Sequence, residues 1–343
     1  MKNNFNNNFT YLLILIIIFS NPSFGKEFKG LFEINHKIES GMSVEKSLNK
    51  SFDKMIYRLS GSSNPSNIWK IINSGVDRKD FIISYSINEI DKSLYLTTQF
   101  NQELLEEQFK KLTIPIIGKS RPTFILIAKI DNGINQPYYL NDEAKIEFDF
   151  KANNLLDDIS ETRGLFIDTP ILDLKDAQVI QDFNYLLDTN EYLSSRYSVD
   201  EIINLEITKI DSEKWSVTGD FNKTINSKNF QDEFLESFES FLHDKASSAL
   251  KNYQIEFLKI NNLSINISNI KSIKDYEDVI DELNGIIGME KLKINALIGD
   301  SLILDIYFFD DSDKFMNRIN DSTKFTLTEI SNRQQDVHIE FKK

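Results

Sequence analysis

The chain has 343 residues and carries 53 Asp and Glu against 39 Lys and Arg, which gives a formal net charge of −14. A negative field of this size repels phosphate backbones and anionic lipid headgroups, so it disfavours nucleic-acid binding and direct adsorption to a membrane. The sequence contains no Cys, which excludes disulfides, thiolate metal sites and lipid attachment through an N-terminal Cys. The hydrophobic content of 41%, with 26 Phe, is typical of packed cores.

The first 25 residues have the layout of an export signal. Lys2 precedes an apolar run from Tyr11 to Phe19, and the small residues Ser23 and Gly25 stand three and one positions before the expected cleavage point. The run is shorter than the roughly 20 residues that a membrane-spanning helix needs. The pattern therefore predicts a signal peptide over residues 1–25, cleaved before Lys26, with an uncleaved N-terminal anchor as the alternative.

An N-terminal α/β module is expected over residues 26–135. The periodicity predicts a strand, a helix, a short helix, two strands, a helix and a strand, over 28–38, 42–59, 69–72, 81–87, 93–100, 104–112 and 122–130. Gly61 is expected to end the first of these helices. The last segment, Pro122–Ile130, is apolar at almost every position, which is typical of a strand buried on both faces, and we expect it to close this module.

A middle α/β module is expected over residues 160–257. Its predicted elements are a strand, a helix, two strands and a long helix, over 165–168, 186–193, 201–210, 214–220 and 230–253. The long helix has a wide apolar stripe that includes Phe234, Phe238 and Leu242, as a helix lying on a sheet requires. The polar segments 131–158 and 256–262 are predicted to be the joints between modules.

The C-terminal stretch, residues 260–343, has the clearest pattern. Every second residue from Leu263 to Ile267 is apolar, as in a half-buried strand. Ser272 caps a predicted helix that stops at Gly288. The expected order is β-α-β-β-α-β, the split βαβ plan, over 263–268, 274–287, 291–296, 302–308, 313–319 and 324–328.

These elements place the chain in the α/β (α+β) class, as two or three tandem small modules with mixed or antiparallel sheets. The first stretch fits the β-α-β-β-α-β order as well, and the second approximates it. The hypothesis of related modules therefore rests on the order of elements and not on repeated residues.

No motif in the sequence predicts catalysis, a cofactor or a metal. The tripeptide Gly118-Lys119-Ser120 lacks the Gly that a phosphate-binding loop needs five residues before its Gly-Lys pair, and a strand follows where a helix should begin. His36, His243 and His338 fall in three different modules, without a His-x-x-x-His pair or a Gly-x-Ser-x-Gly elbow.

Four charged residues stand out by their setting. Arg121 and Arg163 each precede an apolar strand, while Asp173 and Asp176 follow the turn at Pro170. An Arg at the mouth of a strand in an acidic protein usually pairs with a carboxylate that orders a loop, so we expect a structural role. The alternative is that these residues recognise an anionic ligand or a partner.

Three segments are similar, in order and spacing, to the bacterial family DUF2066, which are exported proteins of Gram-negative bacteria, mostly gammaproteobacteria, with no assigned function. The segments are Met55–Gly61, Arg121–Asp131 and Arg163–Asp176, and the resemblance covers roughly residues 28–250. Asp168 departs from the family pattern, which usually has an apolar residue there. The resemblance implies a periplasmic address and transfers no catalytic residue.

The function expected from the sequence is that of a non-enzymatic periplasmic interaction or scaffolding protein with an unknown envelope protein as its partner. The first alternative is a small-ligand binder with a site at a module joint, where clefts form, and with Arg121 and Arg163 as anion anchors. The second alternative is an enzyme that uses carboxylates, of which Asp173 and Asp176 would be the first to test.

Overall fold

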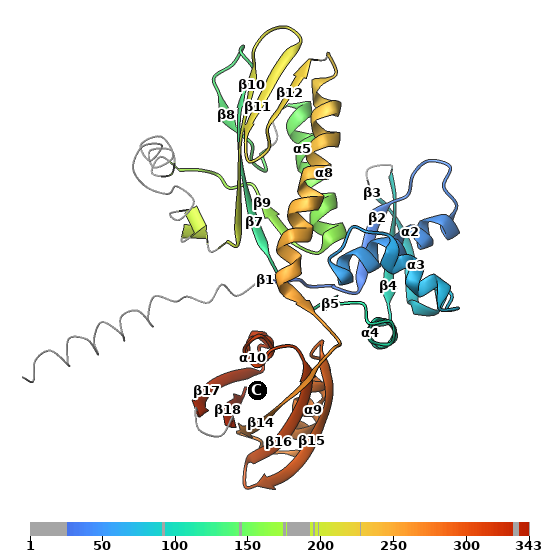
Figure 1. Ribbon diagram of the computed structural model, residues 1–343, viewed down its shortest axis with the longest axis vertical. Helices are drawn as coiled ribbons and strands as arrows, with labels where there is room; N and C mark the ends of the chain where they lie inside the picture. Colours follow the sequence, from blue (N-terminus) through green and yellow to red (C-terminus); the bar gives the residue numbers. More distant parts are fainter. Residues whose placement is uncertain are drawn as a thin grey trace, which may run out of the picture.

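The computed structural model describes residues 26–90, 93–143, 146–173, 176, 193–194, 196–197, 199–226, 228–331 and 336–342. It confirms the predicted class: helices and mixed or antiparallel sheets form an α/β fold with several small modules (Figure 1). The predicted signal peptide lies outside the described residues, as does most of the helix predicted over 186–193. No helix in the described ranges is long and apolar enough to cross a membrane.

The N-terminal module is a three-stranded antiparallel sheet covered by helices. Its strands lie in the order β2-β4-β3, and the elements are β2 (Glu33–Lys37), α2 (Val44–Ser60), α3 (Ser66–Asn73), η1 (Arg78–Phe81), β3 (Ile82–Ile90), β4 (Ser93–Phe100) and α4 (Gln102–Lys111). The Ser43 hydroxyl accepts a hydrogen bond from the Lys46 amide at the start of α2. Gly61, with φ 68°, ends this helix in the left-handed conformation, as predicted.

The apolar strand β7 (Thr123–Asp131) belongs to the middle sheet. It pairs in parallel with β10 (Glu201–Lys209) and with β9 (Phe166–Asp168). It is buried on both faces, as predicted, but the expectation that it closes the N-terminal module is wrong. A strand buried on both faces needs covering layers on both sides, and in this chain the later segments provide them.

The middle sheet has strands in the order β12-β11-β10-β7-β8, with β9 also on β7. The remaining strands are β8 (Tyr138–Tyr139), β11 (Lys214–Gly219) and β12 (Lys223–Asn226). Helices α5 (Glu147–Arg163) and α8 (Phe230–Leu250) lie side by side along it (Figure 1). Because α5 packs Phe148, Leu156 and Ile159 into this core, the joint predicted over 131–158 is in fact part of the middle module.

The C-terminal module follows the predicted element order with one addition. Its elements are β14 (Ile260–Ser268), α9 (Ile273–Asn284), β15 (Met289–Ile298), β16 (Ser301–Phe309), α10 (Ser312–Asp321), β17 (Phe325–Ser331) and β18 (Asp336–Phe341). The strand order is β15-β16-β14-β18-β17. The additional strand β18 lies parallel to β14, and it moves β17 to the edge of the sheet.

Short strands and shared apolar side chains join the modules. β13 (Gln254–Ile255) pairs with β5 (Ile116–Ile117), and β1 (Lys26–Glu27) pairs with β6 (Ser120–Arg121). Ile255, Ile287 and Phe309, which come from the C-terminal third of the chain, pack into the N-terminal core. The N-terminal and C-terminal modules therefore share buried surface.

Candidate functional site

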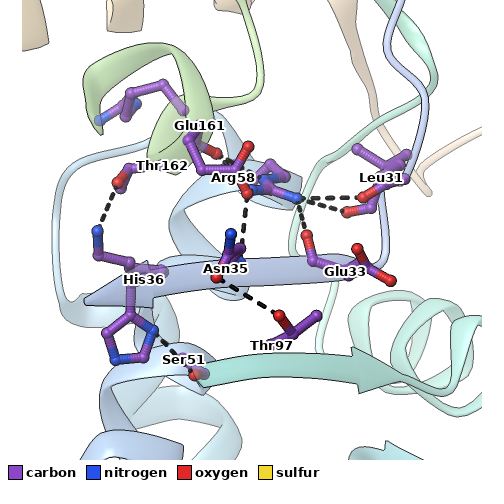
Figure 2. A network of polar contacts seen from close by, with 12 residues as sticks. Leu31, Glu33, Asn35, His36, Ser51, Arg58, Thr97, Glu161 and Thr162 are labelled. Carbon is purple, nitrogen blue, oxygen red and sulfur yellow. Dashed lines mark hydrogen bonds and ion pairs between the residues drawn. The ribbon is translucent and has the colours of Figure 1, made fainter. Parts of the chain in front are cut away.

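Arg58, on α2, is fully buried where the ends of α2 and α5 meet (Figure 2). Its Nε donates to the Glu161 carbonyl at 3.0 Å, its Nη1 donates to the Leu31 and Glu33 carbonyls at 3.2 and 2.5 Å, and its Nη2 lies 2.7 Å from Glu161 Oε1. Burial lowers the pKa of Arg58, and the Glu161 carboxylate opposes that shift. Arg58 was not among the residues predicted from the sequence, although it stands three positions before Gly61, the end of a helix.

Arg121 is also fully buried, and it links α2, α5 and the segment that enters β7. Its guanidinium donates to four backbone carbonyls, those of Ile117, Gly118, Arg58 and Arg163, over 2.7 to 3.3 Å. Burial, with Arg58 and Arg163 nearby, lowers the pKa of Arg121 far below its usual value. No carboxylate bonds it among the described residues; the partners are carbonyls, two of them in the last turns of helices, where the dipole favours a cation.

Arg163 closes α5 and is 1% exposed. Its Nη2 donates to the Gly61 carbonyl at 2.6 Å and to the Ser247 hydroxyl at 3.0 Å. Its Nε and Nη1 have no hydrogen-bond partner, and Arg163 has no ion pair with any described residue. Burial lowers the pKa of Arg163 to about 10. Of the two arginines picked from the sequence, Arg121 is saturated with bonds and Arg163 is not.

Asp173 and Asp176 bond each other's backbone in a reciprocal pair. The Asp173 amide donates to Asp176 Oδ2 at 3.1 Å, and the Asp176 amide donates to Asp173 Oδ1 at 2.8 Å. Arg196 bridges both carboxylates at 2.7 and 2.8 Å, and the Tyr197 hydroxyl donates to Asp176 at 2.9 Å. These contacts tie Asp173 and Asp176 to each other and to Arg196 and Tyr197.

A cavity of about 710 Å³ lies between α2, α5 and α8. Arg163 lines it together with His243 and Tyr57, and its charged lining further includes Lys50, Lys54, Asp53, Asp158, Glu236, Glu239 and Asp244. Lys54 bonds Asp158 Oδ1 at 2.7 Å and the Thr162 hydroxyl at 3.0 Å, so it is occupied within the wall. The cavity lies between the N-terminal and middle modules, and a ligand site was expected at such a joint.

The three histidines lie in different surroundings. His36 on β2 is buried beside the Ser51 hydroxyl, which lies 3.3 Å from its Nδ1, and burial lowers its pKa to about 4. His243 on α8 lines the cavity, and His338 lies on β18. The described ranges hold no group of three or more His, Asp or Glu able to bind a metal ion.

Gly118 and Lys119 link β5 to β6, and Ser120 begins β6 just before β7, so a tight connection precedes the buried strand, as predicted. They line a second cavity of about 270 Å³ against the end of α9 and the residues Arg318 and Lys324. Glu27, Asp281 and Glu282 line the same cavity. It separates the turn from the C-terminal module, and its charges of both signs do not form a phosphate cradle.

A free strand edge lies on the N-terminal module. β3 pairs only with β4 in the described sheet, and its apolar residues Ile83, Tyr85 and Ile87 are 65, 54 and 41% exposed. Tyr85 and Ile87 lie opposite Thr98 and Leu96, which are fully buried beneath α2. The core face of the sheet therefore continues onto β3, where no described residue covers it. We call Val44, Leu48, Ile83, Tyr85 and Ile87 the β3 surface.

A groove of about 710 Å³ runs along the β3 surface, with Glu45 and Lys79 at its side. Single exposed apolar residues are ordinary, but a contiguous apolar face beside a free edge is typical of an interaction site. This surface could not be predicted from the sequence, because the alternation in β3 indicates a buried face without showing whether a helix covers it.

No family model, no curated protein and no solved structure matches this chain. The resemblance to DUF2066 therefore stays a prediction.

Proposed function

We propose that this protein is a non-enzymatic interaction protein of the bacterial cell envelope, exported by its N-terminal signal, that binds an extended segment of a partner protein at β3. In this mode the partner adds a strand to the free edge and lays alternate apolar side chains on the β3 surface. The export and the periplasmic address rest on residues 1–25 and on the resemblance to DUF2066.

The observation that carries this proposal is the composition of the edge. β3 is nine residues long and contains no Lys and no Pro, the residues with which proteins commonly block an unpaired edge. Its single charge is Glu89, at the far end from the groove. An edge that is long, apolar and unblocked is prone to aggregation unless a partner covers it.

Strand addition also suits a partner whose sequence varies, because backbone hydrogen bonds supply much of the affinity. The side chains on the β3 surface would then set the specificity, since only every second residue of the added strand faces them. The ion pair of Glu45 and Lys79, at 2.8 Å, lies beside the groove and offers both signs of charge at its rim.

Site-specific photo-crosslinking in intact cells tests the proposal. A photoreactive residue at Ile87 should give a discrete adduct with a second envelope protein, and Tyr85→Lys in the same chain should abolish it. The matched control is Ile134, which is 80% exposed in a loop outside the β3 surface, and it should give no such adduct.

Three results would contradict the proposal. The first is the absence of any adduct at Ile87, and the second is an identical adduct from Ile134. The third is an adduct whose mass is twice that of the chain, because it would assign β3 to self-association.

The carboxylate enzyme considered from the sequence receives no support from the described residues. Asp173 and Asp176 both face Arg196, and the Asp176 side chain is fully buried. A general acid or base must reach a proton on a substrate, which a buried carboxylate held by Arg and Tyr does not do.

A further inference from the structure

The three buried arginines differ in how their charge is compensated. Arg58 has a carboxylate at 2.7 Å, and Arg121 uses each of its three nitrogens to donate to carbonyls. Arg163 donates through Nη2 alone, so its Nε and Nη1 are buried without partners. A buried polar group without a partner is costly, and more so when it carries a charge. An anion at Nε and Nη1 would remove that cost.

Arg163 lines the cavity between α2, α5 and α8, which is large enough for a small organic molecule. The adjacent Nε and Nη1 of a guanidinium form a planar fork that matches the two oxygens of a carboxylate. Both nitrogens are buried, so a carboxylate reaches them only if a side chain of the cavity lining moves. His243 lines the cavity and is close enough to Arg163 for its pKa to be lowered by that charge, so it is the side chain expected to move.

Acidic residues of α8 and α5 supply negative charge in the lining of the same cavity. Burial and the charge of Arg163 lower the pKa of His243, while the charges of Glu239, Asp158 and Asp244 oppose this shift. Asp158 is paired with Lys54, whereas Asp244 has no ion pair with a described residue. Among the described residues, the only ion-pair partner of Glu239 is His243, at 3.8 Å. The lowered pKa of that imidazole favours its neutral form, so it does not compensate the Glu239 charge. Two carboxylates of the same cavity lining, those of Glu239 and Asp244, thus have no Lys or Arg partner among the described residues.

We propose that the cavity between α2, α5 and α8 binds a small zwitterion, an α-amino acid or a short peptide. Its carboxylate accepts hydrogen bonds from Nε and Nη1 of Arg163, and its ammonium group faces Glu239 and Asp244. The site is separate from the β3 surface, and neither proposal depends on the other.

Titration calorimetry on the whole mature chain, with glycine and glycylglycine as probes, tests this site. Each probe should bind with saturable heat, whereas acetate and methylammonium, which carry one of the two charges each, should bind at least about tenfold more weakly. No saturable heat from either zwitterion would overturn the proposal, and so would acetate binding as tightly as glycine.

Variants then locate the binding. Arg163→Met should abolish the binding. Asp244→Asn should lower the affinity for the zwitterions about tenfold and leave the affinity for acetate unchanged. Glu233→Gln is the control, because this residue lies on α8 outside the cavity lining. If Arg163→Met fails to fold, then Asp244→Asn and Glu239→Gln decide: affinities equal to that of the Glu233→Gln chain would overturn the site.

Discussion

Buried arginines are costly single residues, and Arg121 links backbone groups from three parts of the chain. It bonds carbonyls of Ile117 and Gly118 in the entry to β7, of Arg58 in α2 and of Arg163 in α5. From the sequence, Arg121 was expected to pair with a carboxylate, but in the structure it donates to four backbone carbonyls, two of them at helix ends. A sequence shows that an Arg precedes a strand; it does not show which backbone groups the fold brings to it.

Arg121→Met should lower the free energy of unfolding by about 3–5 kcal/mol, because it removes the buried guanidinium that donates to four backbone carbonyls. Lys129→Met is the matched control: Lys129 pairs with Glu206 at the surface, and its loss should cost less than about 1 kcal/mol. Urea unfolding of both variants measures the difference. Equal losses would contradict the role given to Arg121.

His36 should make the stability depend on pH. Its folded pKa is lowered from 6.5 to about 4, mainly by burial and further by Lys54 and Lys50. Between these values the unfolded chain binds the proton and the folded chain does not, so stability decreases as the pH falls from about 6.5 to about 4 and then levels off. The contribution is on the order of 3 kcal/mol.

The measurement is the urea midpoint at several pH values, in the native chain and in His36→Leu. The substitution should flatten the part of the pH dependence between about pH 6.5 and 4, while the contributions of the carboxylates remain in both proteins. A difference between the two chains that does not change with pH would contradict the buried neutral state of His36.

At the scale of the elements, most helices and strands could be predicted, because each has a local signal. The helix α2 has its Ser43 cap and Gly61 end, and β7 has its unbroken apolar run. The helix α5 was missed, since its many acidic residues hide the apolar spacing of Phe148, Ala152, Leu156 and Ile159. The partner of β7 could not be predicted either, because pairing between distant strands depends on tertiary contacts.

The same limit applies to the candidate sites. Arg121 and Arg163 were found because each stands next to a strand or a Gly, which are local features. Arg58 and the cavity-lining residues of α8 were not found, because only the packing of α2, α5 and α8 brings them together.

The end of α5 depends on a glycine. Gly164 has φ 61°, and a Cβ there would lie 2.7 Å from Cγ of the buried Arg58. Gly164→Ala should therefore cost about 2 kcal/mol or more, from backbone strain together with displacement of Arg58. Gly133→Ala, with φ 69° and open space around it, should cost about 1 kcal/mol from the backbone alone. Thermal unfolding compares the two, and equal costs would show that the contact with Arg58 is unimportant.

At the scale of the whole molecule, the modules are joined by packing as well as by the chain. Ile255, Ile287 and Phe309 are at most 5% exposed, and all three pack with N-terminal residues such as Phe109 and Ile116. The ion pair of Lys110 and Glu290 bridges α4 and β15 at the same boundary. A core shared by two modules couples their unfolding, because neither can open without exposing the apolar surface of the other.

Phe309→Ala should consequently destabilise both modules, by about 3–5 kcal/mol where the cavity does not collapse. Hydrogen exchange measured by mass spectrometry should become faster in α2 as well as in β16. Phe315→Ala provides the control, since this buried ring stacks on Phe308 inside the C-terminal core and should accelerate exchange chiefly there. If α2 exchanged at the native rate in Phe309→Ala, the modules would be shown to unfold independently despite their contact.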